Sequence, residues 1–192
     1  PLRGAFELAH DDEIIDKNPC DRLKNQKTQE TEPDPFNEIE RERILNWLKE
    51  KYIADYPTVY WYFVVAFWTG CRPSEIIALT WQDVDFLNKQ IHINKGRVNG
   101  VQQETTKTNK ARFVDLNDFA FEAFQQLRLL TYLKYEHVFI CDETGEEFTT
   151  QKSLSEKFVA ALKANGIRYR PAYNTRHTYA TVCLMNGLNP VY

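Results

Sequence analysis

One stretch of the chain places an arginine at the start of a helix. Residues 69–75 read TGCRPSE, in which Gly70 ends an apolar run and Pro73 suits the first position of the next helix. Free backbone N–H groups, the positive end of the helix dipole and the Arg72 guanidinium would then face one anion. Glu75 is placed to reach back and cap the backbone. The pattern predicts an anion site, although it also fits an ordinary helix start with a solvated Arg72.

A second stretch places a lysine in a turn between two predicted strands. Lys107 lies in the sequence TKT, and Arg112 follows on the next strand. A turn lysine can reach into a cleft as a proton donor or as a phosphate contact, but most turn lysines are only solvated. Both interpretations stay open on these residues alone.

A third stretch opens the last predicted helix. Tyr173 and Arg176 are three positions apart and therefore share a helical face, so that a phenol and a guanidinium could converge on one oxyanion. His177 lies on an adjacent face, and we interpret it as a core histidine bonded to backbone.

Together, and in this order, the three stretches resemble the tyrosine recombinase family, specifically its phage-type integrases. The segments that carry the resemblance are TGCRPSEIIALTWQDVDF, TKTNKARFVDL and YNTRHTYATVCLMNGLNP, and the resemblance spans about residues 36–192. It implies site-specific DNA recombination or integration by metal-free phosphoryl transfer, through a 3′-phosphotyrosine intermediate. It implies no cofactor and no metal.

The resemblance also implies a role for each residue. Arg72 and Arg176 match the two catalytic arginines, and Glu75 matches the acidic residue that orients the first of them. Lys107 matches the lysine that protonates the departing 5′ oxygen of DNA. Tyr173 stands where many members have histidine, which leaves a general-base role at that position open. Planar, permanently charged guanidiniums suit the negative charge that spreads over a phosphate under attack.

The nucleophilic tyrosine is expected outside this chain. The family carries it in a last helix beyond the Gly-x-Asn-Pro segment, and Tyr192 follows Arg176 too closely to match it. The third histidine or tryptophan position is expected outside as well, so that this stretch alone is expected to be inactive in cleavage. Two alternatives stay open: a non-catalytic DNA-binding derivative, and a DNA breaking-rejoining enzyme similar to type IB topoisomerases.

Composition bounds the remaining possibilities. With 43% hydrophobic residues and few glycines and prolines, the 192-residue chain can bury a core, which excludes a disordered protein. The longest apolar run, residues 59–68, is roughly half of a bilayer span. Four cysteines and four histidines never pair at ligand spacing, which indicates reduced thiols and no zinc site. The net charge of −3 gives DNA binding no bulk support.

The expected partners, double-stranded DNA of an attachment-site core and other integrase protomers, follow from the resemblance, as does a location in the bacterial cytoplasm at the nucleoid.

Hydrophobic periodicity predicts the elements that must hold these residues. Helices are expected over 3–15, 36–52, 57–69, from 73, and over 118–132, 150–164 and 174–186. Strands are expected over 90–94, 101–106 and 111–116, with the first two joined at the Asn99-Gly100 turn. The class is α+β: a mostly helical catalytic domain with a small three-stranded antiparallel sheet. Residues 1–32 are expected to be the last helix of a core-site DNA-binding domain plus a linker, and 33–192 a catalytic domain truncated at its C-terminus.

Overall fold

The computed structural model describes residues 2–21, 23, 33–103 and 111–188, and it divides the chain into two compact units, residues 1–32 and 33–192. The first unit contains helix α1 (Leu2–Asp11). This helix is shorter than predicted, because the chain turns after Asp11 and Glu13 takes a positive φ of 59°. Arg3 donates from its guanidinium to the backbone carbonyls of Cys20 and Leu23, which folds the following segment back onto the helix.

Helix α2 (Glu38–Tyr52) opens the second unit. Asn37 caps it, and Glu40 returns a hydrogen bond to the Asn37 backbone, completing a capping box. The helix therefore begins two residues later than predicted from Phe36. Phe36 instead buries its ring in the core, where it meets Phe67 and Phe158 edge-on.

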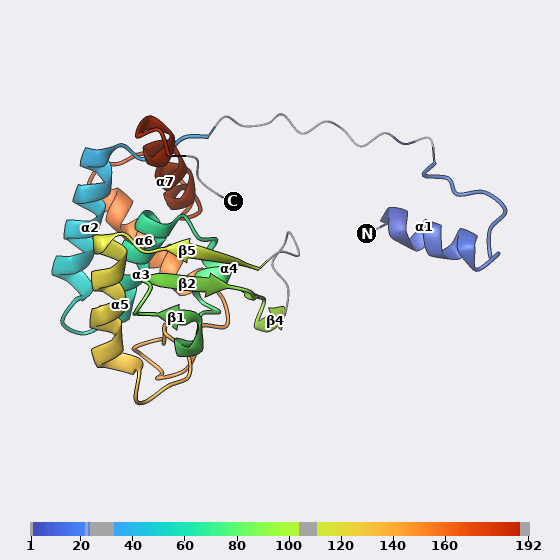
Figure 1. Ribbon diagram of the computed structural model, residues 1–192. Helices are drawn as coiled ribbons and strands as arrows, with labels where there is room; N and C mark the ends of the chain where they lie inside the picture. The colour runs from blue at the N-terminus through green and yellow to red at the C-terminus, as the bar shows by residue number, and fades with distance from the viewer. Residues whose placement is uncertain (1, 22, 24–32, 104–110, 189–192) are drawn as a thin grey trace. The chain divides into compact units, whose positions relative to one another are not determined.

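The centre of this unit is helix α3 (Pro57–Thr69), which has buried residues on every side. Pro57 occupies its first turn, and Gly70 ends it with a left-handed φ of 64°. It packs against α2, α5 (Asp118–Thr131) and α7 (Asn174–Met185), while α6 (Lys152–Ala164) packs against α2. Figure 1 shows α2, α5 and α6 grouped around α3, with α7 at one end of the group. The predicted helices are confirmed, with boundaries shifted by a few residues.

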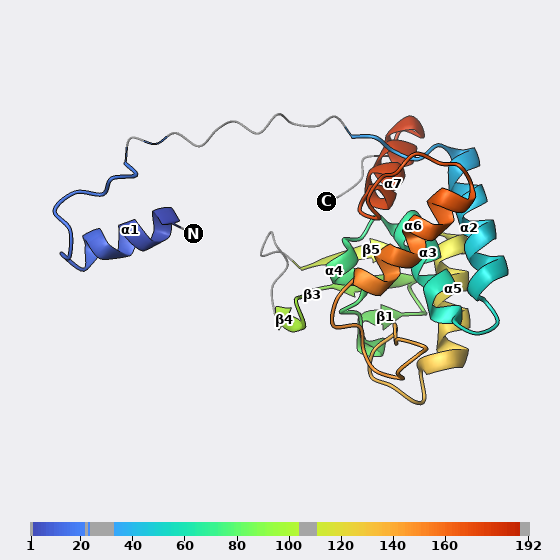
Figure 2. The same cartoon turned by 180° about the vertical axis from the view of Figure 1, so that it is seen from behind.

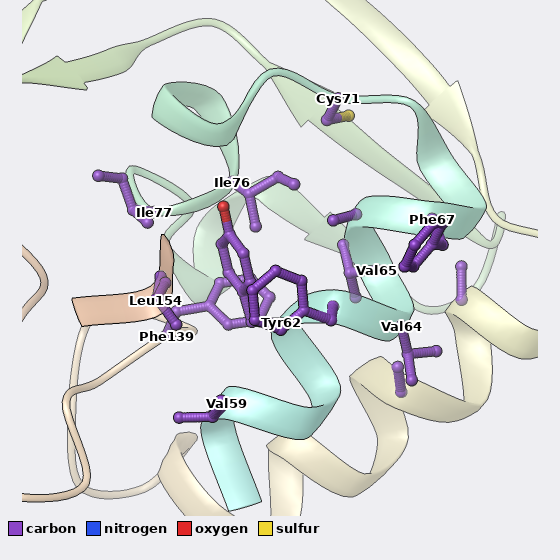
Figure 3. Close-up of a cluster of buried hydrophobic side chains, with 14 of the residues drawn as sticks. Val59, Tyr62, Val64, Val65, Phe67, Cys71, Ile76, Ile77, Phe139 and Leu154 are labelled. Carbon is purple, nitrogen blue, oxygen red and sulfur yellow. The ribbon is translucent and has the colours of Figure 1, made fainter. Parts of the chain in front are cut away.

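The core extends from α3 to the short helix α4 (Pro73–Ile76). Figure 3 shows side chains of α3, among them Val59 and Phe67, pointing to different sides of the helix, with Ile76 and Ile77 in the same cluster. Ile76 and Ile77 are fully buried. The chain directly after Arg72 is therefore anchored in the core, which fixes the backbone from which Arg72 projects.

Among the described residues, the strands form two small antiparallel sheets rather than one. The three-stranded sheet has the order β1 (Val84–Asp85), β2 (Gln90–Ile93) and β5 (Arg112–Asp115), with Ile93 opposite Arg112. A separate hairpin joins β3 (Gly96–Val98) to β4 (Val101–Gln103) around the Asn99-Gly100 turn.

The fold class is confirmed, and so is a three-stranded antiparallel sheet, but the predicted pairing of 90–94 with 101–106 is wrong. The Asn99-Gly100 turn instead pairs β4 with β3, a strand that the sequence did not indicate. The third strand of the sheet is β1. A strand of two residues is too short to show the alternating pattern from which strands are predicted. Figure 2 shows β3 and β4 from the other side, where β3 runs beside α4. Among the described residues, no helix is both long and apolar enough to span a bilayer.

Candidate active site

Arg72 stands immediately before α4 and is held there by Glu75. The Arg72 backbone N–H donates to Oε2 of Glu75 at 2.8 Å, as the sequence predicts for a capping carboxylate. The Arg72 guanidinium also donates, from Nη1 to Oε1 of Glu75, at 2.8 Å. One carboxylate thus fixes both the main chain and the side chain of Arg72.

Glu75 binds a second arginine that the sequence did not single out for this role. Arg112 on β5 donates from Nη1 to Oε1 at 3.1 Å and from Nη2 to Oε2 at 2.7 Å, a two-bond contact across 37 positions. Glu75 is only 2% exposed. Burial raises the pKa of Glu75, but hydrogen bonds from Arg112 and Arg72 outweigh it and hold this pKa below its ordinary value. The carboxylate is therefore charged and shared by two guanidiniums.

Arg176, on α7, contacts the loop that precedes Arg72. It is 7% exposed and donates from Nη1 to the carbonyl of Gly70 at 2.5 Å. Tyr179, one turn later on α7, packs against Gly70 so closely that a Cβ there would lie 2.5 Å from Cδ1 of its ring. The start of α7 is thus docked on the residues that lead into Arg72.

The electrostatics show that the two predicted arginines belong to one cluster. Burial is the largest cause that lowers the pKa of Arg176, and the positive charge of Arg72 is the next. Tyr173 and Glu75 act in the opposite direction, and Arg112 lowers the Arg176 pKa further. Two guanidiniums therefore bind the Glu75 carboxylate, and a third, that of Arg176, is near enough to feel their charges. The surplus of positive charge suits an anionic ligand.

Tyr173 lies at the open side of this cluster. It precedes the first residue of α7, is 41% exposed, and shares with Arg72 a pocket of about 400 Å³. Other parts of that pocket are lined by Ser74, Gln151 and Ser155. His177 is half-buried, with its ring edge-on to Tyr173 at 5.3 Å between centroids. A ligand in the pocket can therefore contact Tyr173 and Arg72 together.

The structure brings together four of the five predicted residues, and the fifth lies outside the described part of the chain. Arg72, Glu75, Tyr173 and Arg176 belong to this cluster, whereas Lys107 lies outside the described residues, as does Tyr192. Within the described part of the chain, no group of three or more His, Cys, Asp or Glu side chains could hold a metal ion. All four cysteines are free thiols.

Sequence reasoning missed Arg112, although it noted this residue after Lys107. The local signal was weak, because an arginine beginning a strand is common. Only the placement of β5 near α4 gives it a carboxylate partner.

Comparison with known proteins agrees with the fold. An integrase of transposon Tn1549, solved in complex with transposon right end DNA, has the same fold at a TM-score of 0.75 and 24% identity. The match covers 98% of this chain and 66% of that one. A lambda integrase dimer bound to a COC′ core site matches with a TM-score of 0.71 at 16% identity, over 97% of this chain and 62% of that one. The fold is thus that of integrases.

The sequence places the chain in the same class. The model of the phage integrase family matches residues 34–191, so the chain belongs to the phage integrase family. Prophage integrase IntR of Escherichia coli (strain K12) is 28% identical over 214 residues, which cover 100% of this chain and 50% of IntR. The chain spans about half the length of the curated relatives it matches.

Proposed function

We propose that this chain contributes the phosphate-binding part of a site-specific DNA recombinase, a phage or mobile-element integrase. The observation that supports the proposal is that the helix carrying Arg176 contacts the loop that leads into Arg72. Arg72 and Arg176 are far apart in sequence. Arg176 nevertheless binds the carbonyl of Gly70, which is two residues before Arg72, and Glu75 orients the Arg72 guanidinium. Family membership supports the same reaction class.

In this proposal the arginines hold the non-bridging oxygens of the scissile phosphate. The phenolate oxygen of a tyrosine that has given its proton to solvent attacks phosphorus, the P–O5′ bond breaks, and a proton from Lys107 reaches the departing 5′ oxygen. As the tyrosine–phosphorus bond forms, negative charge grows on the oxygens facing Arg72 and Arg176. Each preorganised donor supplies roughly 3 kcal/mol, about a hundredfold in rate. The 3′-phosphotyrosine conserves the bond energy, so that rejoining needs no ATP.

Tyr173 has the role of a hydrogen-bond donor to the phosphate in this scheme. It is the N-cap residue of α7, three residues before Arg176, and it is 41% exposed. In this proposal the nucleophilic tyrosine lies outside this chain. The 192-residue chain alone is therefore expected to bind DNA weakly and to form no covalent adduct.

The partners and domains follow from the same proposal. The double-stranded core of an attachment site is the substrate, and other protomers join on it, in the cytoplasm of a bacterial host. The Tn1549 integrase was solved on DNA and the lambda integrase as a dimer on a core site.

Residues 1–32 act as the last helix of a core-site-binding domain plus linker, and the division of the chain at residue 32 supports that boundary. A pair of guanidiniums also suits a relaxing enzyme similar to type IB topoisomerases, which differs in cleaving without a defined site.

A suicide-substrate assay tests the proposal. The natural full-length protein is mixed with nicked duplexes drawn from the DNA that flanks its gene, and covalent protein–DNA adducts are separated on denaturing gels. We expect adducts at one defined sequence, formed about a hundredfold more slowly by Arg72→Ala and at the wild-type rate by Arg41→Ala. Arg41 is a matched control, because it is buried and paired with a carboxylate, Glu38, on α2. Binding without any adduct would instead favour a non-catalytic DNA-binding derivative, and adducts at many sequences a topoisomerase-like enzyme.

A further inference from the structure

We infer that Arg112 is a positioning residue for the proposed cleavage reaction, acting on Arg72 through the carboxylate they share. The inference rests on the proposed function and extends it to a residue with no assigned role. Both terminal nitrogens of the Arg112 guanidinium bind the Glu75 carboxylate. The effect of Arg112 on a bound phosphate therefore runs through Glu75 and Arg72.

The first step of the argument is geometric. The Arg112 guanidinium contacts both oxygens of Glu75, and such a two-bond contact fixes the plane of a carboxylate. Arg72 meets the same carboxylate with its backbone N–H and with Nη1. With the carboxylate plane fixed by Arg112, the direction in which Arg72 presents its guanidinium is fixed as well.

The second step concerns charge. A carboxylate paired with Arg72 alone would neutralise the guanidinium that has to attract phosphate. Sharing that carboxylate with Arg112 leaves the pair of arginines with one uncompensated positive charge. The Arg112 side chain is 13% exposed, so solvent screens this charge only weakly. Arg112 therefore keeps Arg72 oriented by Glu75 without cancelling its charge.

The third step is the rigidity of the element that carries Arg112. Its strand, β5, pairs with β2 in a fixed register, with Arg112 opposite Ile93. Ile93 is buried in the core. Arg112 therefore approaches Glu75 from a strand with a defined position, and it can transmit that position to Arg72.

The experiment compares two substrates with the natural full-length protein. One nicked duplex has an ordinary scissile phosphodiester, and the other has a methylphosphonate, which lacks the negative charge of one non-bridging oxygen. Single-turnover adduct formation is measured for the wild type, Arg112→Met, Arg112→Lys, Arg72→Ala and the double variant Arg72→Ala/Arg112→Met. DNA affinity and thermal unfolding are measured for each.

We expect Arg112→Met to slow cleavage of the phosphodiester by roughly tenfold to a hundredfold, because it removes part of one oxyanion contact. DNA affinity should change little. The loss should shrink on the methylphosphonate, as for Arg72→Ala, and Arg112→Lys should recover part of the rate. The double variant should be about as slow as Arg72→Ala alone, because both substitutions act on the same contact, the one between Arg72 and the phosphate.

Several results would overturn the inference while leaving the function intact. They are a wild-type rate for Arg112→Met, an equal loss on both substrates, and losses that multiply in the double variant. Unfolding of both Arg112 variants at the assay temperature would also overturn it, because Arg112 would then hold the fold and not the site. Absence of adducts from the wild type on the phosphodiester would overturn the proposed function itself, and this inference with it.

Discussion

Arg176 donates a hydrogen bond to the backbone carbonyl of Gly70 at 2.5 Å, across 106 positions of sequence. The contact joins the helix that carries one proposed catalytic arginine to the loop that precedes the other. Gly70 takes a left-handed φ and lies against the ring of Tyr179. The relative position of the two arginines therefore depends on a residue that has no side chain.

Substitution of Gly70 by alanine should disrupt this junction. The new Cβ would lie 2.5 Å from Cδ1 of Tyr179, and the φ of 64° is already unfavourable for alanine. Gly166→Ala is the matched control, since Gly166 has a φ of 63° and open space around its Cβ position. We expect the control to lose about 1 kcal/mol of unfolding free energy. Gly70→Ala should lose about 2–4 kcal/mol, because a steric clash adds to the same backbone strain.

Alkylation of Cys71 gives a local readout of the same change. Burial raises the pKa of this thiol to about 11, so it should react slowly in the native protein. Mass spectrometry of alkylated peptides should show faster labelling of Cys71 in Gly70→Ala than in Gly166→Ala. Equal unfolding free energies and equal labelling in the two variants would contradict the assigned role of Gly70.

Replacement of Glu75 by glutamine should change how stability depends on pH. The pKa of Glu75 in the folded protein lies below its ordinary value of 4.5, so the ionised carboxylate stabilises the fold fully above that value. This contribution is lost as the pH falls below 4.5 and through the folded-state pKa. Glu75→Gln should be less stable at pH 7 by about 3 kcal/mol, because two partly buried arginines lose their counter-charge. Urea unfolding from pH 7 to pH 3 should show the difference between wild type and variant narrowing with acidity, and a constant difference would contradict the charged state assigned to Glu75.

Lys107 is predicted to act as the general acid. In the natural full-length protein, Lys107→Ala should bind its site normally but cleave more slowly, by about a hundredfold or more. A substrate with a 5′-bridging sulfur should restore the rate, because a thiolate leaves without protonation. Lys110→Ala, a neighbouring lysine, is the control and should cleave normally. If the sulfur substrate does not restore cleavage by Lys107→Ala, the lysine has another role.

Tyr173 is predicted to donate a hydrogen bond at the phosphate. Tyr173→Phe should slow cleavage about tenfold, the effect of one neutral hydrogen bond, whereas Tyr173→His should keep most of the activity. Single-turnover assays on the nicked duplex measure both. Peptide mapping of the adduct provides the decisive control, since DNA attached to Tyr173 itself would make this residue the nucleophile.

The sequence predicted the helices and part of the site because their signals are local. Gly70, Pro73 and the capping position of Glu75 all lie within one turn of Arg72, and the cap forms as expected. The contact between Glu75 and Arg112 has no such signal, since it depends on how β5 packs near α4. The pairing of β2 was misassigned for a similar reason, because its partner β1 is only two residues long.

The junction at Gly70 also has an evolutionary consequence. Arg176 binds a main-chain atom, which every amino acid provides, so residue 70 is constrained instead by its left-handed φ and by the Tyr179 ring against it. Glu75 and Arg112 are joined through side chains, and either can be replaced if the other compensates. Across relatives we therefore expect correlated changes between positions 75 and 112, and near-invariance at 70 and 176. The Arg176–Gly70 contact and the Glu75–Arg112 contact should therefore differ in how their residues vary across the family, although both belong to one site.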